Sequence, residues 1–247
     1  MLSADHRPPS YQGTPESNDP MWVLTLYRST IGKKVIMAVT GLVLVGFVIG
    51  HMAGNLQVFI GSAKMNAYAA FLKSTGELLW LVRLGLLAAV VLHMLMAWQL
   101  TRIRAKARPV AYERRDPQVS TVAARTMRWG GVLLLVFIVF HILHFTTGTV
   151  FPVASRPDAL HPAYSRTDVY GNVISAFRSP WVVTFYVVSM LFLMLHLFHG
   201  AWSSVRTLGL MKPSRHPLRH RVSTAIALIV WLGFTVVPVA VFLGVIR

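Results

Sequence analysis

Six of the ten histidines in this chain lie in long apolar stretches, where a polar imidazole is costly and usually marks a functional site. They are His51, His93, His141, His144, His196 and His199. Imidazole is the commonest metal ligand in proteins. One such ring alone could simply hydrogen-bond a neighbouring helix. Because these are spread over four separate stretches, we interpret them as the ligands of redox cofactors.

The stretches that carry these histidines are long enough to cross a membrane, which takes about 20 mostly apolar residues. Only 13% of the 247 residues are charged, against roughly a quarter in a soluble domain. Backbone polar groups must be paired within lipid, so each span is expected to be helical. Five spans are predicted, at about 35–60, 78–101, 129–151, 181–205 and 222–245.

The expected fold class is therefore all-α: a polytopic membrane protein whose five transmembrane helices form a haem-binding bundle. Residues 28–247 are expected to form this single membrane domain. Residues 1–27, which include four prolines and are mostly polar, are expected to form a mobile cytoplasmic tail.

Basic residues gather in alternate loops and set the expected orientation. They lie before span one, between spans two and three, and between spans four and five. Because cytoplasmic loops are rich in Lys and Arg, the N-terminus is expected in the cytoplasm and the C-terminus outside. The net charge of +16 then needs no nucleic-acid partner, since the charges flank spans that lie in a lipid bilayer. The expected location is the inner (cytoplasmic) membrane of a cell, as a multi-pass protein.

The helical rise of about 1.5 Å per residue places the histidines at two depths. His51 and His141 lie roughly 25 and 20 Å beyond the basic residues that precede their spans, toward the outer surface. His93 and His196 lie nine and ten residues before basic inner ends, which is roughly 14 Å. We call His51 and His141 the outer pair, and His93 and His196 the inner pair. The same rise predicts that the two pairs differ in depth by roughly 10 Å.

Each pair combines histidines from two different helices, which is the arrangement that bis-histidine haem ligation needs. His144 and His199 each follow a paired histidine by three residues and point about 60° around the helix. They are therefore alternative ligands, although we favour a role as hydrogen-bond partners of a haem propionate or of a loop. Histidine pairs also ligate one iron of a Rieske-type [2Fe–2S] centre. Because the chain has no cysteine, a partner subunit would have to supply both thiolates.

Short motifs surround the paired histidines. They are Gly50-His51-Met52-Ala53-Gly54-Asn55-Leu56-Gln57, Asn66-Ala67-Tyr68 with Phe71-Leu72, Arg128 with Gly131 and His141, and Ser179-Pro180 with His196, Gly200 and Trp202. With His93 forty-two residues after His51, the chain resembles the cytochrome b membrane-anchor subunit of di-haem succinate dehydrogenase or fumarate reductase, the succinate:quinone oxidoreductases of complex II. The resemblance covers about residues 28–245.

The resemblance implies that His51 and His141 ligate the iron of an outer, distal b-type haem, and His93 and His196 that of an inner, proximal one. It implies a flavoprotein subunit and an iron–sulfur subunit on the cytoplasmic face. Electrons would pass from succinate, which is oxidised on another chain, through the haems to a membrane quinone. This reaction belongs to the respiratory chain and the tricarboxylic acid cycle.

A quinone site needs a proton-transferring group close to a cofactor and to the membrane surface. Glu77, at the outer start of span two, is a candidate proton relay, and Trp80 and Arg83 follow it. The alternative quinone site, at the inner end, consists of Ser29, Lys33, Lys34 and Arg128. The sequence leaves both sites open.

Two other functions are compatible with histidine-rich spans. The first is a cytochrome b anchor of another membrane oxidoreductase, of the hydrogenase or formate dehydrogenase type. The second is a non-redox transporter, which would need broken helices or substrate-facing polar groups other than histidine. The motif around His51 favours the succinate:quinone oxidoreductase interpretation over both.

Overall fold

The computed structural model describes residues 21–107, 121–157, 163–210 and 216–247. These residues form helices and turns, with no strand among them. The main helices are α1 (Met21–Arg28), α2 (Thr30–Asn55), α3 (Ser62–Ser74), α4 (Glu77–Lys106), α5 (Val122–His141), α6 (Phe151–Ala154), α7 (Val169–Phe177), α8 (Pro180–Thr207) and α9 (His216–Phe242). A 3₁₀ turn, η1 (Leu56–Phe59), follows α2, and a π-helical turn, η3 (Ile142–Thr146), follows α5.

Five helices are long and apolar enough to cross a membrane, which confirms the predicted number of spans. They are Thr30–Phe59, Glu77–Lys106, Val122–Thr146, Pro180–Thr207 and His220–Phe242. Span three begins about seven residues earlier than predicted and ends about five residues earlier. The start differs because helical hydrogen bonding continues through Arg125 and Thr126, outside the apolar window that defined the prediction. The end differs because the π-turn closes the span at Thr146.

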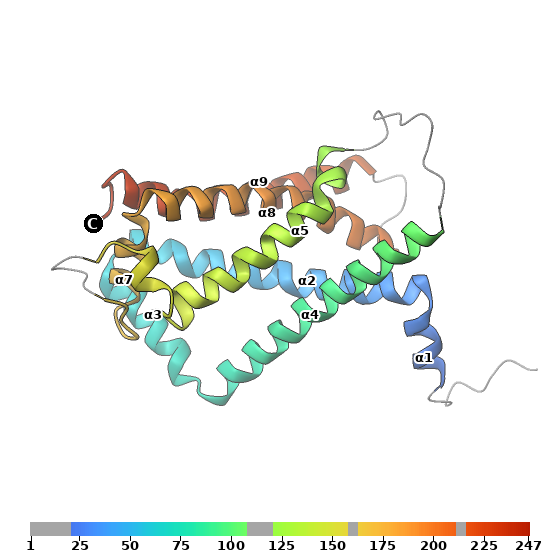
Figure 1. Ribbon diagram of the computed structural model, residues 1–247, viewed down its shortest axis with the longest axis horizontal. Helices are drawn as coiled ribbons and strands as arrows, with labels where there is room; N and C mark the ends of the chain where they lie inside the picture. Colours follow the sequence, from blue (N-terminus) through green and yellow to red (C-terminus); the bar gives the residue numbers. More distant parts are fainter. Residues whose placement is uncertain (1–20, 108–120, 158–162, 211–215) are drawn as a thin grey trace, which may run out of the picture.

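The spans pack around α2 (Figure 1). This helix contacts α4, α8 and α9, while α5 packs on α8, and α8 and α9 run side by side. Helix α4 crosses α2 and diverges from the other spans toward its own N-terminus. The side chains of the spans are largely exposed, as expected of apolar helices that face lipid.

Helix α1 and the C-termini of α4 and α8 lie at one end of the bundle, which we call the basic end (Figure 1). Exposed Arg102, Arg104, Lys106 and Arg206 lie there. Helix α1 includes residues 21–27 of the predicted tail, and residues 1–20 of that prediction lie outside the described part of the chain. The basic residues at 108, 114, 115, 212 and 215 also lie outside it.

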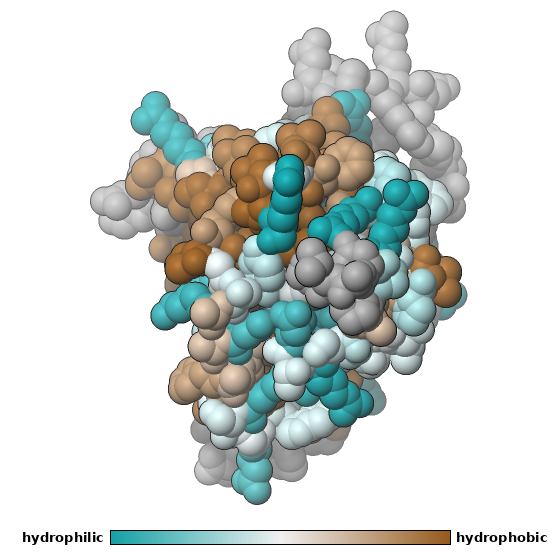
Figure 2. All heavy atoms as spheres, turned by 90° about the vertical axis from the view of Figure 1, so that its left-hand side faces the viewer, coloured by the Kyte–Doolittle hydropathy of each residue, from teal (hydrophilic) through white to brown (hydrophobic). Residues whose placement is uncertain are grey.

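The opposite end is covered by α3, α6 and α7, and we call it the capped end (Figures 1 and 2). Asn66 joins α3 to α7 within this cap. Its side-chain amide donates to Asp168 (2.9 Å), and its side-chain oxygen accepts from the Tyr170 amide (3.0 Å). Asp168 also caps α7 by accepting from the Gly171 amide. Figure 2 shows hydrophilic side chains spread over much of this end, beside an apolar region.

The core of the capped end is apolar and fully enclosed. Val58, Ile174, Phe177, Val182 and Tyr186 are among its buried residues. The loop between spans three and four therefore packs onto the bundle, with seven consecutive buried residues in α7. A second cluster lies deeper, where Met52 packs against Leu197 and Val230.

Candidate functional site in two histidine pairs

The outer pair brings together one histidine from α2 and one from the end of α5. The ring centres of His51 and His141 are 5.7 Å apart, with an interplanar angle of 81°. Phe47 stacks on His51 at 5.3 Å, and Phe137 stacks on His141 at 5.6 Å. Asn55 donates its amide to the His51 carbonyl (2.8 Å) and lies 3.4 Å from His51 Nε2. Neighbouring rings and an amide thus surround the two imidazoles.

The inner pair joins α4 to α8. The ring centres of His93 and His196 are 6.1 Å apart. His93 Nδ1 lies 3.0 Å from the Met37 carbonyl and 3.3 Å from Thr40 Oγ1. Because a carbonyl can only accept, Nδ1 carries the proton and Nε2 keeps its lone pair. A Cβ atom at Gly41 would lie 3.2 Å from His93 Cε1, so this glycine lets the ring lie against α2.

Both separations suit a metal ion held between two imidazoles. Such rings have centres roughly 6 Å apart, because the metal–nitrogen bond is about 2 Å long and the ring centre lies about 1 Å behind the nitrogen. In addition, His196 Nδ1 is buried and has no hydrogen-bond partner among the described residues. A buried polar atom normally has a partner, which here is not among the described residues. The donor set of each pair therefore fits a haem iron, which takes two axial ligands from the protein.

The two pairs can be located along α2 and α8 by the contacts that their rings make. His93 contacts α2 at Thr40, and His51 lies 11 residues beyond it, which is about 16 Å along the helix. On α8, Tyr186 contacts His141 and lies ten residues before His196, which is about 15 Å. The difference in membrane depth of roughly 10 Å stays a prediction.

His144 is engaged by the chain itself. It is fully buried, its Nδ1 lies 3.2 Å from the Tyr186 hydroxyl, and its Nε2 lies 2.9 Å from Ser155 Oγ. The Tyr186 hydroxyl also lies 3.2 Å from His141 Nδ1. With both ring nitrogens occupied, His144 is a hydrogen-bonding residue in this structure.

His199 lies on α8 and is half-buried beside Trp202, with ring centres 6.5 Å apart. Among the rings that the structure describes, that of Trp202 is its ring contact, and no contact with another histidine is seen there.

The outer quinone candidates lie on the exposed start of α4. Glu77 is the first residue of this helix and is exposed, and Gly76 before it has a φ of 55°, which allows the sharp entry of the chain. The Arg83 guanidinium lies over the Trp80 ring at 5.2 Å. Among the described residues, no hydrogen bond or ring contact joins these three to the outer pair, and α4 diverges from the bundle here (Figure 1).

The inner candidates are not gathered into one site. Lys33 is buried and donates to the carbonyls of Tyr27 (2.7 Å) and Arg28 (3.1 Å) at the C-terminus of α1. Ser29 caps α2 by accepting from the Gly32 amide. Both are therefore used to join α1 to α2. Lys34 and Arg128 are exposed.

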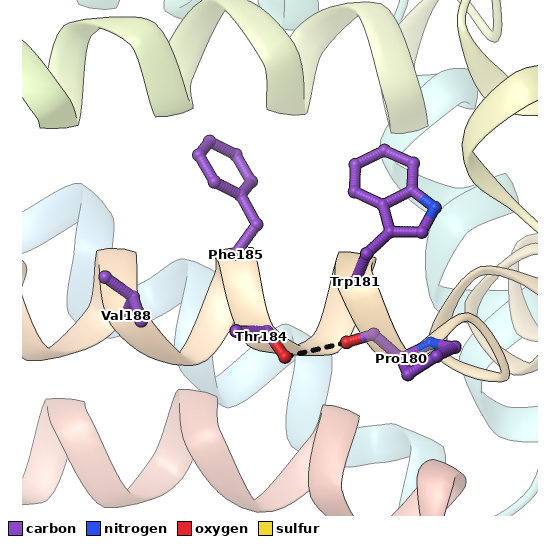
Figure 3. Close-up of a pocket in the computed structure, with 5 residues that line it drawn as sticks. All are labelled: Pro180, Trp181, Thr184, Phe185 and Val188. Atoms are coloured by element: carbon purple, nitrogen blue, oxygen red, sulfur yellow. Dashed lines mark hydrogen bonds between the residues drawn. The ribbon is translucent and has the colours of Figure 1, made fainter.

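An open apolar groove lies at the capped end of α8 (Figure 3). Its lining residues are Pro180, Trp181, Thr184, Phe185 and Val188. The rings of Trp181 and Phe185 point toward α5, where Phe140 contacts both of them and also His144. The Thr184 hydroxyl donates to the Pro180 carbonyl (2.8 Å). One aromatic ring thus separates this groove from His144.

Sequence reasoning missed Tyr186 and Ser155. Tyr186, a hydroxyl-bearing residue ten positions before His196 in a mostly apolar span, is the signal that could have indicated a polar partner at the outer level. Ser155 lies in the loop, and its contact with His144 depends on how α6 folds back. Comparison of the chain with known protein families, with curated proteins and with solved structures gave no match.

Proposed function

We propose that this chain is the di-haem cytochrome b anchor of a succinate dehydrogenase or fumarate reductase. The observation that carries the proposal is the pair of imidazole couples at two depths of one helical bundle. His51 and His141 would hold the outer b-type haem, and His93 and His196 the inner one. Each haem, when bound, would take up and release one electron.

The residues around the pairs support ligation. The Met37 carbonyl accepts from His93 Nδ1 and thereby directs Nε2 toward the partner ring, as second-shell carbonyls do for metal-bound histidines. The motif after His51 has a packing role, because a Cβ atom at Gly54 would lie 2.9 Å from the Tyr68 ring of α3. This glycine therefore lets the cap approach α2 one turn beyond the outer pair.

Charge and topology support the orientation within the proposal. The basic end carries exposed arginines and lysines, so by the positive-inside rule it would face the cytoplasm, with the N-terminus there and the C-terminus outside. The flavoprotein and iron–sulfur subunits would dock at this end in the inner membrane of the cell. Electrons from succinate, which is oxidised on the flavoprotein, would enter at the inner pair and leave toward the outer pair.

For quinone, we propose Glu77 as the proton relay near the outer end, with Trp80 and Arg83 beside it. The contacts of the inner set favour this choice, because Lys33 and Ser29 are already hydrogen-bonded within α1 and α2. The carboxylate of Glu77 is exposed at the start of its helix.

The test is a count of haem in the purified complex. Pyridine haemochrome analysis is expected to give about two protohaems per chain. His93→Ala and His196→Ala should remove the same haem, and His51→Ala and His141→Ala the other. His199→Ala, on the same helix as His196, is the matched control and should retain both.

Three results would contradict the proposal and indicate another function. Absence of haem, with iron and acid-labile sulfide present, would indicate a Rieske-type [2Fe–2S] centre that shares thiolates from a partner subunit. Two haems with a nickel or molybdenum enzyme as the co-purifying partner would indicate a hydrogenase or formate dehydrogenase anchor. A purified complex that contains neither haem nor iron would exclude the proposed redox role.

A further inference from the structure

A continuous hydrogen-bonded chain leads from the outer pair into the cap. Tyr186 Oη lies 3.2 Å from His141 Nδ1 and 3.2 Å from His144 Nδ1, and His144 Nε2 lies 2.9 Å from Ser155 Oγ. Phe137 and Phe177 pack on the Tyr186 ring at 5.1 and 5.0 Å. Tyr186, His144 and Ser155 of this hydrogen-bonded chain are buried. A buried hydrogen-bonding group that is left without a partner costs about 1–3 kcal/mol.

When the Tyr186 hydroxyl donates to one of the two histidines, the protons in this hydrogen-bonded network can run in only two directions, because each neutral imidazole has one donor and one acceptor nitrogen. In the first direction, His141 Nδ1 donates to Tyr186, Tyr186 donates to His144 Nδ1, and His144 Nε2 donates to Ser155. His141 Nε2 then keeps its lone pair. In the second direction every bond is reversed, and His141 Nε2 carries the proton.

The second direction leaves an N–H group of His141 with no acceptor among the described residues. Protein N–H groups normally have an acceptor, and the first direction gives one to every ring N–H group of the network. The first direction leaves unpaired only the Ser155 proton, at the edge of the cap. The contacts therefore favour the form in which His141 Nε2 is available as a ligand.

We infer that Tyr186, His144 and Ser155 are positioning residues that fix the tautomer and orientation of His141 and tune the outer iron. The inference rests on the proposed function. It links the cap to the outer centre, because Ser155 belongs to the loop that packs on the bundle. The inner centre has its own orienting group, the Met37 carbonyl, and does not touch this chain.

The test is a redox titration of both haems in the intact complex carrying Tyr186→Phe, which removes the hydroxyl and keeps the ring. A hydrogen bond from Nδ1–H makes the imidazole a stronger donor and stabilises ferric iron. Loss of this hydrogen bond should lower the preference of the outer site for ferric over ferrous iron about tenfold. The midpoint potential of the outer haem then rises by about 59 mV for one electron. The inner potential should not change.

Two further variants keep the test decisive if Tyr186→Phe assembles poorly. Ser155→Ala should raise the outer potential by a smaller amount, because it removes only the last acceptor, and Ser155→Thr should restore the wild-type value. Ser189→Ala is the matched control. It deletes a fully buried hydroxyl of α8, three residues from Tyr186, that donates to Phe185 instead.

Two haems whose outer potential is unchanged in both Tyr186→Phe and Ser155→Ala would overturn the inference alone. Equal shifts of both potentials would also overturn it, since they would indicate general loosening of the bundle. A wild-type complex without haem would contradict the inference together with the proposed function.

Discussion

Gly41→Ala is expected to weaken the inner centre selectively. The new Cβ atom would lie 3.2 Å from His93 Cε1 and 3.5 Å from His93 Nδ1, and the first of these contacts is tighter than ordinary van der Waals contact. The ring must therefore move by a few tenths of an ångström away from α2. This movement strains the 3.0 Å hydrogen bond from His93 Nδ1 to the Met37 carbonyl, which orients the ring.

Loss of an orienting partner typically lowers metal affinity by about 10–100-fold. Because Gly41→Ala weakens the bond without deleting a partner, we expect the lower limit, about tenfold or about 1.4 kcal/mol. The assay follows haem transfer from the purified complex to a high-affinity acceptor protein in excess. The two haems are distinguished by their midpoint potentials, and the inner haem should leave about ten times faster.

Gly46→Ala is the matched control. It lies on the same helix, and a Cβ atom there would meet nothing within 4 Å. Both substitutions gain the same helix propensity, roughly 0.5–1 kcal/mol relative to glycine, so only the contact with His93 differs. Equal haem retention in the two variants, or loss of the outer haem in Gly41→Ala, would refute the argument.

Three other predictions concern the two ends of the bundle. Lys33→Met should lower the free energy of unfolding by about 1–2 kcal/mol in thermal unfolding, because two carbonyls at the end of α1 lose a charged donor. The control, Lys34→Met at an exposed position, should change it by less than about 0.5 kcal/mol. Asn66→Ala should make the amides of α7 exchange about tenfold faster in hydrogen–deuterium exchange, and Lys64→Ala, exposed on the same helix, should not. Glu77→Gln should reduce quinone-linked turnover by a factor of about 10², while both haems and the succinate-to-dye activity persist. Loss of turnover only in variants at the basic end would instead place the quinone site there.

The spans could be predicted from sequence because lipid leaves the backbone few choices. An apolar stretch of sufficient length must be helical there, whatever its neighbours are. Short helices carry no such constraint, and α1, α3 and α7 were not predicted for this reason. Their stability comes from contacts such as that of Asn66 with Asp168, which join segments about one hundred residues apart.

The depth of each histidine along its own helix was also determined by the sequence, since the helical rise is fixed. That reasoning placed His51 with His141, and His93 with His196, and the structure brings these same rings together. Their role as ligands stays a prediction, as do the partners and the quinone.

Only the tertiary structure decided how the rings are used within each level. Sequence spacing leaves open which of two histidines three residues apart faces the partner helix, because rotation about the axis is set by packing. The fold answers this at the outer level by placing Tyr186 and Ser155 on the two nitrogens of His144. It also places the two pairs on different stretches of α2, because the His93 ring packs on this helix at Met37 and Thr40, which lie 14 and 11 residues before His51.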